Sequence, residues 1–559
     1  MNAERLLQAF SMIGDDPARI QQLRQVAIAL AISGKLRADA SALSNEAMIA
    51  AVERVKKDLY KQGMITKPKH FEPVQQEDLP DNFPQSDRFV PLGSLARIEK
   101  GLTGIKQATP GPFPLVVTGA ERSTSDHFDF DGAAAIVPLV SSTGHGHASL
   151  NRLHYQEGKF ALGTILAAVF PYDPELISAR FLFEYLSAFK DELLVARMTG
   201  TANVTLSVGR IAEIPVPLVE PATQKRLDDL MALLDRLEAA RTAREATRDR
   251  LTAASLARLT ESDADPADFP ANARFTLATL PALTTRPDQI KPLRQTILNL
   301  AVRGKLVEQD PSDEPASELV KRFKAAKIAH KQATGDARNK LAPDADVASY
   351  PLDLPKGWAV QSFENLFLFI DYRGNTPPKT DSGVPLITAK NVRMGALNRE
   401  PREYISEKTF KSWMTRGFPK IGDLFFTTEA PLANVCLNDI QEPFALAQRV
   451  ICFQPYADVS TPYLMLALCG DVMQSLIDGQ ATGMTAKGIK AAKLKPLPIP
   501  LPPLAEQHRI VAKVDALMAL CDRLEAALTT ADTTRARLLE ALLANALNPA
   551  TMQEMEAAE

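Results

Sequence analysis

The chain has 559 residues, too many for one hydrophobic core, and the usual domain of about 100 to 200 residues predicts about three to five units. Its formal net charge of -3 excludes a strongly basic protein, so any nucleic-acid-binding surface must be local. The four cysteines lack C-x-x-C spacing, and no signal peptide or apolar run of about 18 residues is present, so we expect a cytoplasmic protein without disulfides or a membrane span.

The chain nearly repeats itself. LMALLDRLEAA (230–240) returns as LMALCDRLEAA (517–527), and LRQVAIALAISGKL from Leu23 returns as LRQTILNLAVRGKL from Leu293, at an offset of 270 residues. Each half therefore carries the same series of segments, which is helical, variable and again helical. We predict a pseudo-two-fold internal repeat, in which the variable segments carry whatever differs between the halves.

The first repeated module is helical. It aligns without gaps over residues 20–62 and 290–332, and its apolar residues recur every three or four positions. Gly34 and Gly304 then occupy places suited to a helix C-terminus, and a second helix follows each. We predict an N-terminal helical region over residues 1–78, and a linker with a central helical region over residues 263–350.

The composition changes after these helices. LPDNF (79–83) opens one variable stretch and LPKGW (354–358) opens the other, and both contain short apolar runs between prolines and glycines. Such runs predict strands of about five residues with some helix. We therefore predict mixed α/β domains over residues 79–213 and 351–498. Because their sequences hardly resemble each other, the two domains are expected to meet different targets.

Each variable domain leads through a proline-rich segment into a long helix, predicted over residues 214–262 and, with a C-terminal tail, over residues 499–559. Apolar residues in these helices alternate steps of three and four, which is typical of a coiled coil. Because one apolar stripe needs a partner, we predict that the two helices pair antiparallel, although periodicity alone also allows a parallel pair. The predicted interface residues are Leu230, Leu234, Leu237, Leu517, Cys521, Leu524 and Leu528.

The two long helices differ by one insertion. Gln224 and Met231 are seven positions apart, whereas Gln507 and Met518 are eleven apart, so the second copy has four extra residues. Four helical residues rise about 6 Å, nearly two base-pair steps of DNA. If each variable domain binds DNA, the helices would act as a ruler.

No catalytic signature of useful specificity is present. The chain lacks a phosphate-binding loop, a G-x-G-x-x-G loop and an Asn-Pro-Pro-aromatic methylation motif. The pair His145 and His147 suggests a metal, but acidic or cysteine ligands are missing at the usual spacing. Glu157-Gly158-Lys159 has the E-x-K form of a nuclease, a tripeptide that is common by chance. We predict no catalytic residue and no metal or other cofactor in this chain.

Local charge is the strongest sign of DNA binding. The segment from Lys390 to Lys420 contains eight basic and three acidic residues, a net charge of about +5. An ordinary solvated face would explain the same composition. Polar residues able to read base edges lie in or near this segment. The DNA-contact candidates of the second domain are Arg373, Asn375, Lys390, Asn391, Arg393, Arg416 and Lys420. Those of the first domain are Lys106, His145, His147, Asn151, Arg152, Thr201 and Asn203.

These motifs together resemble the DNA specificity subunit of type I restriction-modification systems. The resemblance rests on LPKGW, TTEAPLANV, the closing stretch TGMTAKGIKAAKLKPLPIPLPPLAEQHRIVAKVDALMALCDRLEAA, and LRQTILNLAVRGKLVEQDPSDEPASEL between the halves. It covers nearly the whole chain. The first half departs from it, with LPDNF for the L-P-x-G-W form and PATQKRL for PLAEQHRIV, which leaves the start of its recognition domain open.

The resemblance implies a non-catalytic subunit in which two α/β target recognition domains are separated by two long antiparallel coiled-coil helices. Each domain would read one half of a split, asymmetric sequence in double-stranded DNA. The conserved helices would dock two methyltransferase subunits and, through them, restriction subunits. S-adenosylmethionine, ATP and Mg would belong to those partners. Two other classes stay open, namely a solitary nuclease or methyltransferase and a coiled-coil scaffold that does not bind DNA.

Overall fold

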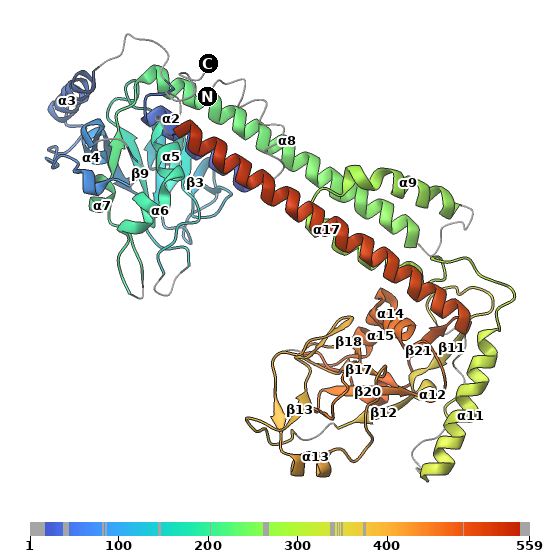
Figure 1. Ribbon diagram of the computed structural model, residues 1–559. Coiled ribbons are helices and arrows are strands. Elements are labelled where there is room, and N and C mark those ends of the chain that lie inside the picture. The colour runs from blue at the N-terminus through green and yellow to red at the C-terminus, as the bar shows by residue number, and fades with distance from the viewer. Residues whose placement is uncertain are drawn as a thin grey trace, which may run out of the picture. The chain divides into compact units, whose positions relative to one another are not determined.

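A computed structural model describes residues 17–36, 44–80, 83, 86–143, 147–201, 203–260, 268–335, 341–343, 345, 347, 350–372, 376–483 and 486–547 (Figure 1). The chain folds into two compact units, the first formed by Met1–Glu245 with Asp532–Glu559 and the second by Ala246–Ala531. Within the described ranges, every helix is too short or too polar to cross a bilayer.

The first unit contains two four-stranded sheets. One sheet is antiparallel, with the order β2 (Ala96–Lys100), β9 (Leu166–Pro171), β6 (Ala134–Pro138) and β7 (His154–Gln156). The other has the order β4 (Ser123–Ser125), β3 (Phe113–Val116), β8 (Lys159–Leu162) and β5 (Phe130–Asp131), with β3 and β8 parallel. The apolar runs AAIVP and LAAVFP form the buried strands β6 and β9, because both of their faces are covered.

The second unit repeats this topology. Its four-stranded sheet has the order β12 (Phe367–Asp371), β20 (Val450–Pro455), β17 (Leu424–Thr427) and β18 (Val435–Leu437), which matches the first sheet strand for strand. A second sheet has the order β16 (Tyr404–Ile405), β13 (Val384–Ile387) and β19 (Ala445–Leu446), again with one parallel pair, β13 and β19. The hairpin of β14 (Val392–Arg393) and β15 (Ala396–Leu397) belongs to this unit only among the described residues.

Short helices complete each domain. In the first unit α5 (Ala179–Ala188) lies on β6, β7 and β9, and in the second α14 (Thr461–Cys469) packs against β18. Ser178 and Ser460 cap these two helices, since each hydroxyl accepts a backbone N–H of the first turn. The others are α4 (Leu92–Leu95), α6 (Lys190–Leu193) and α7 (Val208–Ala212) in the first unit and α12 (Phe363–Leu366), α13 (Glu407–Trp413), α15 (Asp471–Gln480) and α16 (Ala491–Leu494) in the second.

The proline-rich exits are strands. β10 (Pro215–Pro217) pairs with β1 (Phe89–Pro91), and β21 (Pro498–Leu501) pairs with β11 (Ala359–Ser362), so each domain closes with its end beside its beginning. Proline lacks the N–H that a central strand needs, and these two-stranded pairs leave that side of the proline strand free. The domain boundaries that the sequence suggests, 79–213 and 351–498, remain predictions.

The two long helices are α8 (Pro221–Thr260) and α17 (Leu504–Leu547). Helix α8 begins in the first unit and ends in the second, whereas α17 begins in the second and ends in the first, so the chain runs in opposite directions along them. In the first unit Leu539 of α17 is buried in the same core as Leu227 and Leu234 of α8. The mixed α/β class and the antiparallel course of the two helices are confirmed.

The helices that precede the variable domains are α2 (Pro17–Ile32) and α3 (Asn45–Lys61) in the first unit. Those of the second unit are α9 (Phe269–Leu283), α10 (Ile290–Val302) and α11 (Ala316–Thr334). Helix α2 packs against α5, and α10 packs against α14 and α15. Each repeated helix therefore lies on the equivalent helix of its variable domain.

The two repeated sequences meet each other in both units. Arg24 of α2 forms ion pairs with Asp235 (2.6 Å) and Glu238 (3.0 Å) of α8. At the equivalent positions, Arg294 of α10 pairs with Asp522 and Glu525 of α17, both at 2.7 Å. The segments beginning LRQ and the segments LMALxDRLEAA are thus the two sides of one contact, which explains why both are kept in each half.

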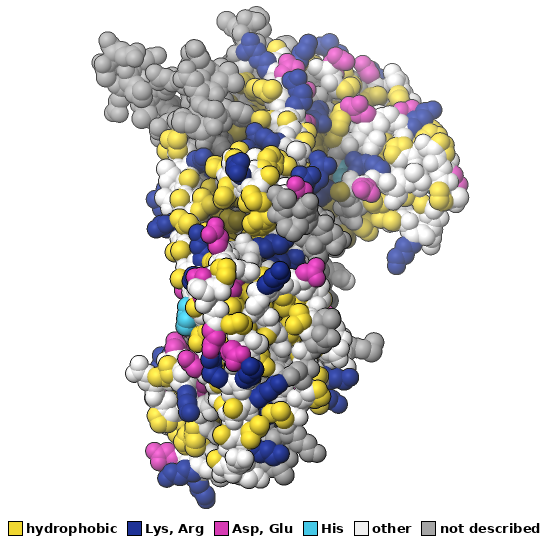
Figure 2. Space-filling model, turned by 90° about the vertical axis from the view of Figure 1, so that its right-hand side faces the viewer, with side chains coloured by type: hydrophobic (Ala, Val, Ile, Leu, Met, Phe, Trp, Pro, Cys, Tyr) yellow, Lys and Arg dark blue, Asp and Glu magenta, His cyan; other side chains and the backbone are white. Residues whose placement is uncertain are grey.

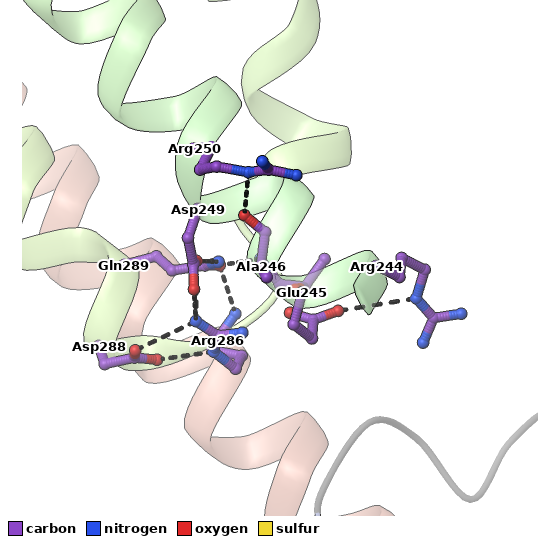
Figure 3. A network of polar contacts seen from close by, with 9 residues as sticks. Arg244, Glu245, Ala246, Asp249, Arg250, Arg286, Asp288 and Gln289 are labelled. Carbon is purple, nitrogen blue, oxygen red and sulfur yellow. Dashed lines mark hydrogen bonds and ion pairs between the residues drawn. The ribbon is translucent and has the colours of Figure 1, made fainter. Parts of the chain in front are cut away.

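Each repeated helix also holds the other long helix. In the first unit the buried Arg19 of α2 pairs with Asp532 of α17 at 2.5 Å. In the second unit Arg286 and Gln289, just before α10, bond to Asp249 of α8 at 2.9 and 3.0 Å (Figure 3). Arg286 is held in addition by Asp288, which makes this junction a network rather than one pair. Each unit therefore clamps both long helices with one repeated helix.

A glutamine fixes the start of each long helix. Gln224 accepts the backbone N–H of Ser178 at 2.9 Å and donates to Val219 O at 2.6 Å. Gln507 likewise accepts from Ser460 N at 3.0 Å and donates to Pro502 O at 3.0 Å. The four extra residues of the second half lie between this anchor and the salt-bridged Asp522, where they form one added turn of continuous helix.

Replacing Arg294 by glutamine should destabilise the second unit by about 1 kcal/mol, because two partly exposed ion pairs are lost. The equivalent Arg24→Gln should do the same in the first unit, and the two effects should add because the sites share no partner. Urea unfolding of the full chain measures both. The control is Lys321→Gln, which removes a well-exposed ion pair with Glu318. If Arg294→Gln lowers the free energy of unfolding by no more than this control does, the clamp is contradicted.

Candidate nucleic-acid interface

Two loops meet at one end of the large sheet in the first unit. The β6–β7 loop (139–153) leaves the end of β6, and the 199–205 hairpin precedes α7. Ser141 N donates to Val204 O and Leu206 N donates to Leu139 O, both at 2.9 Å, so the loops run side by side. Thr199 and Thr205 exchange backbone hydrogen bonds of 2.9 and 2.8 Å and close the hairpin.

The second unit builds the same pair. The β17–β18 loop (428–434) leaves the end of β17, and Ile489 N, just beyond the 482–488 hairpin, donates to Thr428 O at 2.9 Å. Thr482 and Gly488 exchange backbone bonds, both 2.9 Å, and Gly488 also bridges to Glu429. Each variable domain therefore presents two adjacent loops at the equivalent end of its sheet.

A glycine shapes both hairpins. Gly200 has φ +128° and Gly483 has φ +117°, a region that side chains rarely enter. A Cβ would stand 2.1 Å from Asn203 O in the first hairpin and 2.2 Å from Ala486 O in the second. Both hairpins can therefore close only with glycine at this place.

The structure places most first-domain candidates on these loops. His147, Asn151 and Arg152 lie on the β6–β7 loop, and Thr201 and Asn203 lie on the hairpin, all exposed. The hydroxyl of Ser141 holds the loop, since it donates to His147 O (2.5 Å) and accepts from Ser149 N (3.1 Å). His145 lies outside the described residues.

Lys106 lies further along the same end of the first sheet. It is exposed in the turn after β2, and Thr103 beside it accepts from Thr164 N at 3.2 Å. Ile165, in that same β8–β9 turn, accepts from Leu139 N at 2.9 Å, so one turn separates Lys106 from the β6–β7 loop.

In the second domain Arg393 is the candidate nearest the loop pair. It is exposed on the β14–β15 hairpin, where Gly395 N donates to Val435 O at 2.8 Å. Asn434 of the β17–β18 loop donates to Val392 O at 3.0 Å. Arg416 is exposed and donates to Asp371 O at the end of β12. Arg373 and Asn375 lie outside the described residues.

Asn391 requires a correction. Its side chain is only 2% exposed, accepts from Thr388 N and Oγ1, both at 2.9 Å, and donates to Asn398 O and Pro401 O. A buried amide whose groups are already hydrogen-bonded does not offer an edge to a base. Asn391 therefore shapes the turn that carries the exposed Lys390 and Arg393.

The basic segment between Lys390 and Lys420 is less charged than its composition suggests. Arg399 pairs with Asp439 (2.9 Å), Arg402 with Glu400 (3.0 Å), and Lys390 approaches Glu403 (4.0 Å). On the face that Figure 2 shows, basic and acidic side chains are intermingled. Lys420 is bonded through its backbone to Asp423 and Asn438 at the opposite end of β17 from the β17–β18 loop.

Sequence reasoning missed three basic residues, two at these loops and one beside strand β7. Arg449 pairs with Glu429 at 2.7 Å and its carbonyl accepts from Thr428 N. Lys487 lies in the 482–488 hairpin and pairs with Asp478 at 2.7 Å. Arg122 bonds to the edge strand β7 in the first unit. Lys487 stood inside the motif TGMTAKG, whereas Arg122 and Arg449 are isolated in sequence and gave no signal.

No metal or nuclease site emerges among the described residues. They contain no group of three or more His, Cys, Asp or Glu side chains placed to hold a metal ion. Glu157 accepts a hydrogen bond from Tyr155, and Lys159 lies over the Phe128 ring at 4.9 Å, so the E-x-K tripeptide has separate structural contacts. Burial raises the pKa of Cys436 to about 12, which leaves that thiol uncharged.

The predicted coiled-coil residues lie in or against the cores of their own units. Leu234 is buried in the first core, with Leu230 and Leu237 packed against it. Cys521 is buried in the second core, with Leu517, Leu524 and Leu528 packed against it. Both cores also contain residues of the repeated helices, Leu23 of α2 in the first and Ile297 of α10 in the second, and the first core contains Leu539 of the other long helix.

Comparison with known proteins agrees with this architecture. Residues 355–531 match the family described as the type I restriction modification DNA specificity domain. The chain is 26% identical to the specificity subunits of the type I restriction enzymes EcoAI and EcoEI of Escherichia coli, over 95% of this chain and 94% of each relative. Both relatives are therefore matched over almost their full length.

Solved structures show a looser likeness. The HsdS subunit from Thermoanaerobacter tengcongensis covers 83% of this chain and 96% of its own, with 17% identity and a TM-score of 0.39. A second match is a chain from a structure on complex assembly and conformational transition of the type I R-M system. The match covers 83% of this chain and 97% of that chain, with 17% sequence identity and a TM-score of 0.44.

The duplicated loop pairs and helical clamps define a two-domain protein built on an internal repeat. Over nearly its full length the chain is similar to DNA specificity subunits of type I restriction-modification systems, and residues 355–531 match the specificity domain of that family.

Proposed function

We propose that this chain recognises an asymmetric, two-part sequence in double-stranded DNA, with one variable domain on each half. The observation that carries the proposal is the repetition of one loop pair at the same end of the same sheet, with different side chains in the two units. A similar scaffold supplies equivalent positions, while Asn203 and His147 on one side and Lys487 and Arg393 on the other supply different contacts.

The repeated helices support the second part of the proposal. Similar surfaces on two similar clamps can recruit two copies of one partner, and we assign this role to two methyltransferase subunits, with restriction subunits bound through them. The chain itself is the non-catalytic subunit, working in the cytoplasm. S-adenosylmethionine would be held by the methyltransferase, and ATP and Mg by the restriction subunit.

Exchange of residues 351–498 for the corresponding segment of another specificity subunit tests the proposal. We expect the complex with its methyltransferase to keep the first half of its methylated sequence and to change the second half completely. Mapping of methylated adenines in a host genome measures both halves and the spacer between them.

The outcome that would defeat the domain assignment is retention of both halves after the exchange. The rival classes predict other results, since a solitary enzyme would cleave or methylate DNA when purified without partners. A scaffold without a DNA role would show no selective binding even when it is co-expressed with the methyltransferase. The unexchanged chain in the same host is the control.

A further inference from the structure

A cavity of about 840 Å³ lies within the first unit, between the helical clamp and the β6–β7 loop. Its walls come from α2, α5, α8, β7 and the segment between β3 and β4. Its lining includes four arginines, Arg24, Arg122, Arg152 and Arg180, and three carboxylates, Glu184, Asp235 and Glu238. The size is that of a small-molecule site, and the charge is concentrated in arginine.

The three carboxylates that line the cavity already form ion pairs with two of its arginines. Arg24 pairs with Asp235 and Glu238, and Arg180 pairs with Glu184 at 2.6 Å. Burial raises the pKa of Glu184, and the charges of Arg180 and Arg24 offset this in part. Two arginines are thus balanced by the three acidic side chains, which leaves Arg122 and Arg152.

Arg122 is held only by neutral acceptors. Its guanidinium donates to Gln156 Oε1 (3.0 Å), Tyr155 O (3.1 Å) and His154 Nδ1 (3.1 Å), and it makes no ion pair with any described residue. Burial lowers the pKa of Arg122, with no carboxylate to offset it. A cation fixed in this way still has N–H groups left to bind an anion.

His154 supplies a second donor in the same wall. It is 5% exposed, and burial together with the charges of Arg122 and Arg152 lowers its pKa to about 4, so the ring is neutral at physiological pH. Because Nδ1 accepts from Arg122, the ring proton is on Nε2. Nε2 is buried and makes no hydrogen bond of normal geometry to a described residue, while a backbone contact with Thr118 offsets a small part of the lowering of the pKa.

We propose that Arg122, Arg152 and His154 bind a phosphate group in this cavity. A planar guanidinium fork suits a phosphate, and a neutral imidazole N–H adds a third donor. The inference rests on the proposed function for its source of phosphate, since Arg152 belongs to the β6–β7 loop and a DNA backbone phosphate would enter beside it. A free phosphate ester has the same chemistry.

The site belongs to the first unit. The segment after β3 brings Arg122 against edge strand β7, whereas the segment after β13 places the β14–β15 hairpin against the equivalent strand β18. The two halves would therefore hold DNA differently, the first through a phosphate contact in this cavity and the second through an exposed hairpin.

Arg122→Gln tests the assignment in the full chain co-expressed with its methyltransferase. We expect binding to duplexes carrying the methylated sequence to fall about tenfold, with the same factor for duplexes altered in either half, because a phosphate contact carries no sequence information. The slope of log affinity against log salt should fall by about 0.9. Arg122→Lys keeps the charge without the fork and should give an intermediate loss.

Arg97→Gln is the matched control, because Arg97 lies on β2, the opposite edge strand of the same sheet. Thermal melting of all three variants separates lost binding from lost folding. A parallel calorimetric titration with AMP, without DNA, identifies the source of the phosphate. AMP binding that Arg122→Gln abolishes, with DNA affinity unchanged, would assign the site to a free phosphate ester.

Unchanged DNA affinity, salt slope and AMP binding in Arg122→Gln, with selective binding by the unaltered chain, would overturn the phosphate site and leave the proposed function intact. Absence of selective binding by the unaltered complex would instead refute the proposed function. The AMP titration would then test the phosphate site by itself. AMP binding by the unaltered chain that Arg122→Gln abolishes would support the site, and no AMP binding by the unaltered chain would refute it.

Discussion

Replacing Gly483 by valine should weaken selective DNA binding by roughly ten- to a hundredfold, through the second half of the target alone. Gly483 has φ +117°, and a Cβ there would lie 2.2 Å from Ala486 O, so the 482–488 hairpin must open. Opening breaks the exchange of backbone bonds between Thr482 and Gly488 and moves Lys487. Gly483 belongs to the second unit, so we expect the effect at the second half of the target.

Binding assays with duplexes altered in one half at a time measure the effect. The equivalent variant of the first unit, Gly200→Val, should instead weaken selective binding to the first half of the target, because its Cβ would lie 2.1 Å from Asn203 O. Gly479→Ala adds a methyl group within the same unit where nothing lies within 4 Å, and it should leave affinity unchanged. Equal losses at both halves in Gly483→Val would show that the hairpins do not read separate halves.

The helical frame could be predicted because its signals are local and repeated. Heptad spacing indicates the long helices, and two pairs of similar motifs indicate the duplication. The ion pairs between Arg24 and Asp235 or Arg294 and Asp522 were not predicted, because they join residues more than 200 positions apart. The sequence shows that both motifs are kept, whereas only the fold shows that they touch.

The variable domains show the opposite limit. Their amino-acid sequences differ, so comparing the two halves could not reveal that they share one strand order. That order depends on where the buried strands lie in the chain, not on which apolar residue occupies each position. Candidates on the β6–β7 loop were found because polar residues and glycine follow a buried strand. The prediction that Asn391 contacts DNA was wrong because its burial depends on the tertiary fold. The charge of the basic segment was overestimated because Asp439, 40 positions from Arg399, pairs with it.

The departures of the first half from the family motifs are linked in space. In the second half Trp358 of LPKGW donates to both oxygens of Glu506 at 3.1 Å, which joins the domain entrance to the start of α17. The first half has Thr223 at the position of Glu506 and Phe83 as its motif aromatic. Phe83 instead packs against Phe189 at 4.8 Å and Phe89 at 5.7 Å, so an aromatic cluster replaces the hydrogen bond.

Trp358→Phe should therefore destabilise the second unit by about 2 to 4 kcal/mol, because it leaves the carboxylate of Glu506 buried without its main donor. Glu506 is 1% exposed, and among the described residues only the Gln309 side chain, at 3.4 Å, would still donate to its carboxylate. Trp413, the other tryptophan, also belongs to the second unit, so its fluorescence during urea unfolding reports on this unit in the variant. Glu318→Gln, an exposed change, should cost under about 0.5 kcal/mol.

The loss should depend on pH. Burial raises the pKa of Glu506, and the hydrogen bond from Trp358 lowers it in part, so Trp358→Phe raises the folded pKa further above the unfolded value. The deficit is then full above the folded pKa and shrinks as the pH falls through it, since the protonated carboxyl needs no charge partner. A deficit that is constant between neutral and acidic pH would contradict a role for the buried charge.

The double variant Trp358→Phe with Glu506→Thr tests whether the two departures of the first half compensate each other. Each single change removes one partner of a buried contact, but the double change removes both and leaves no buried charge. Its loss should be smaller than the sum of the two single losses by about 1 kcal/mol or more. Strict additivity would mean that Trp358 and Glu506 stabilise the fold independently, and that the first half lost them for unrelated reasons.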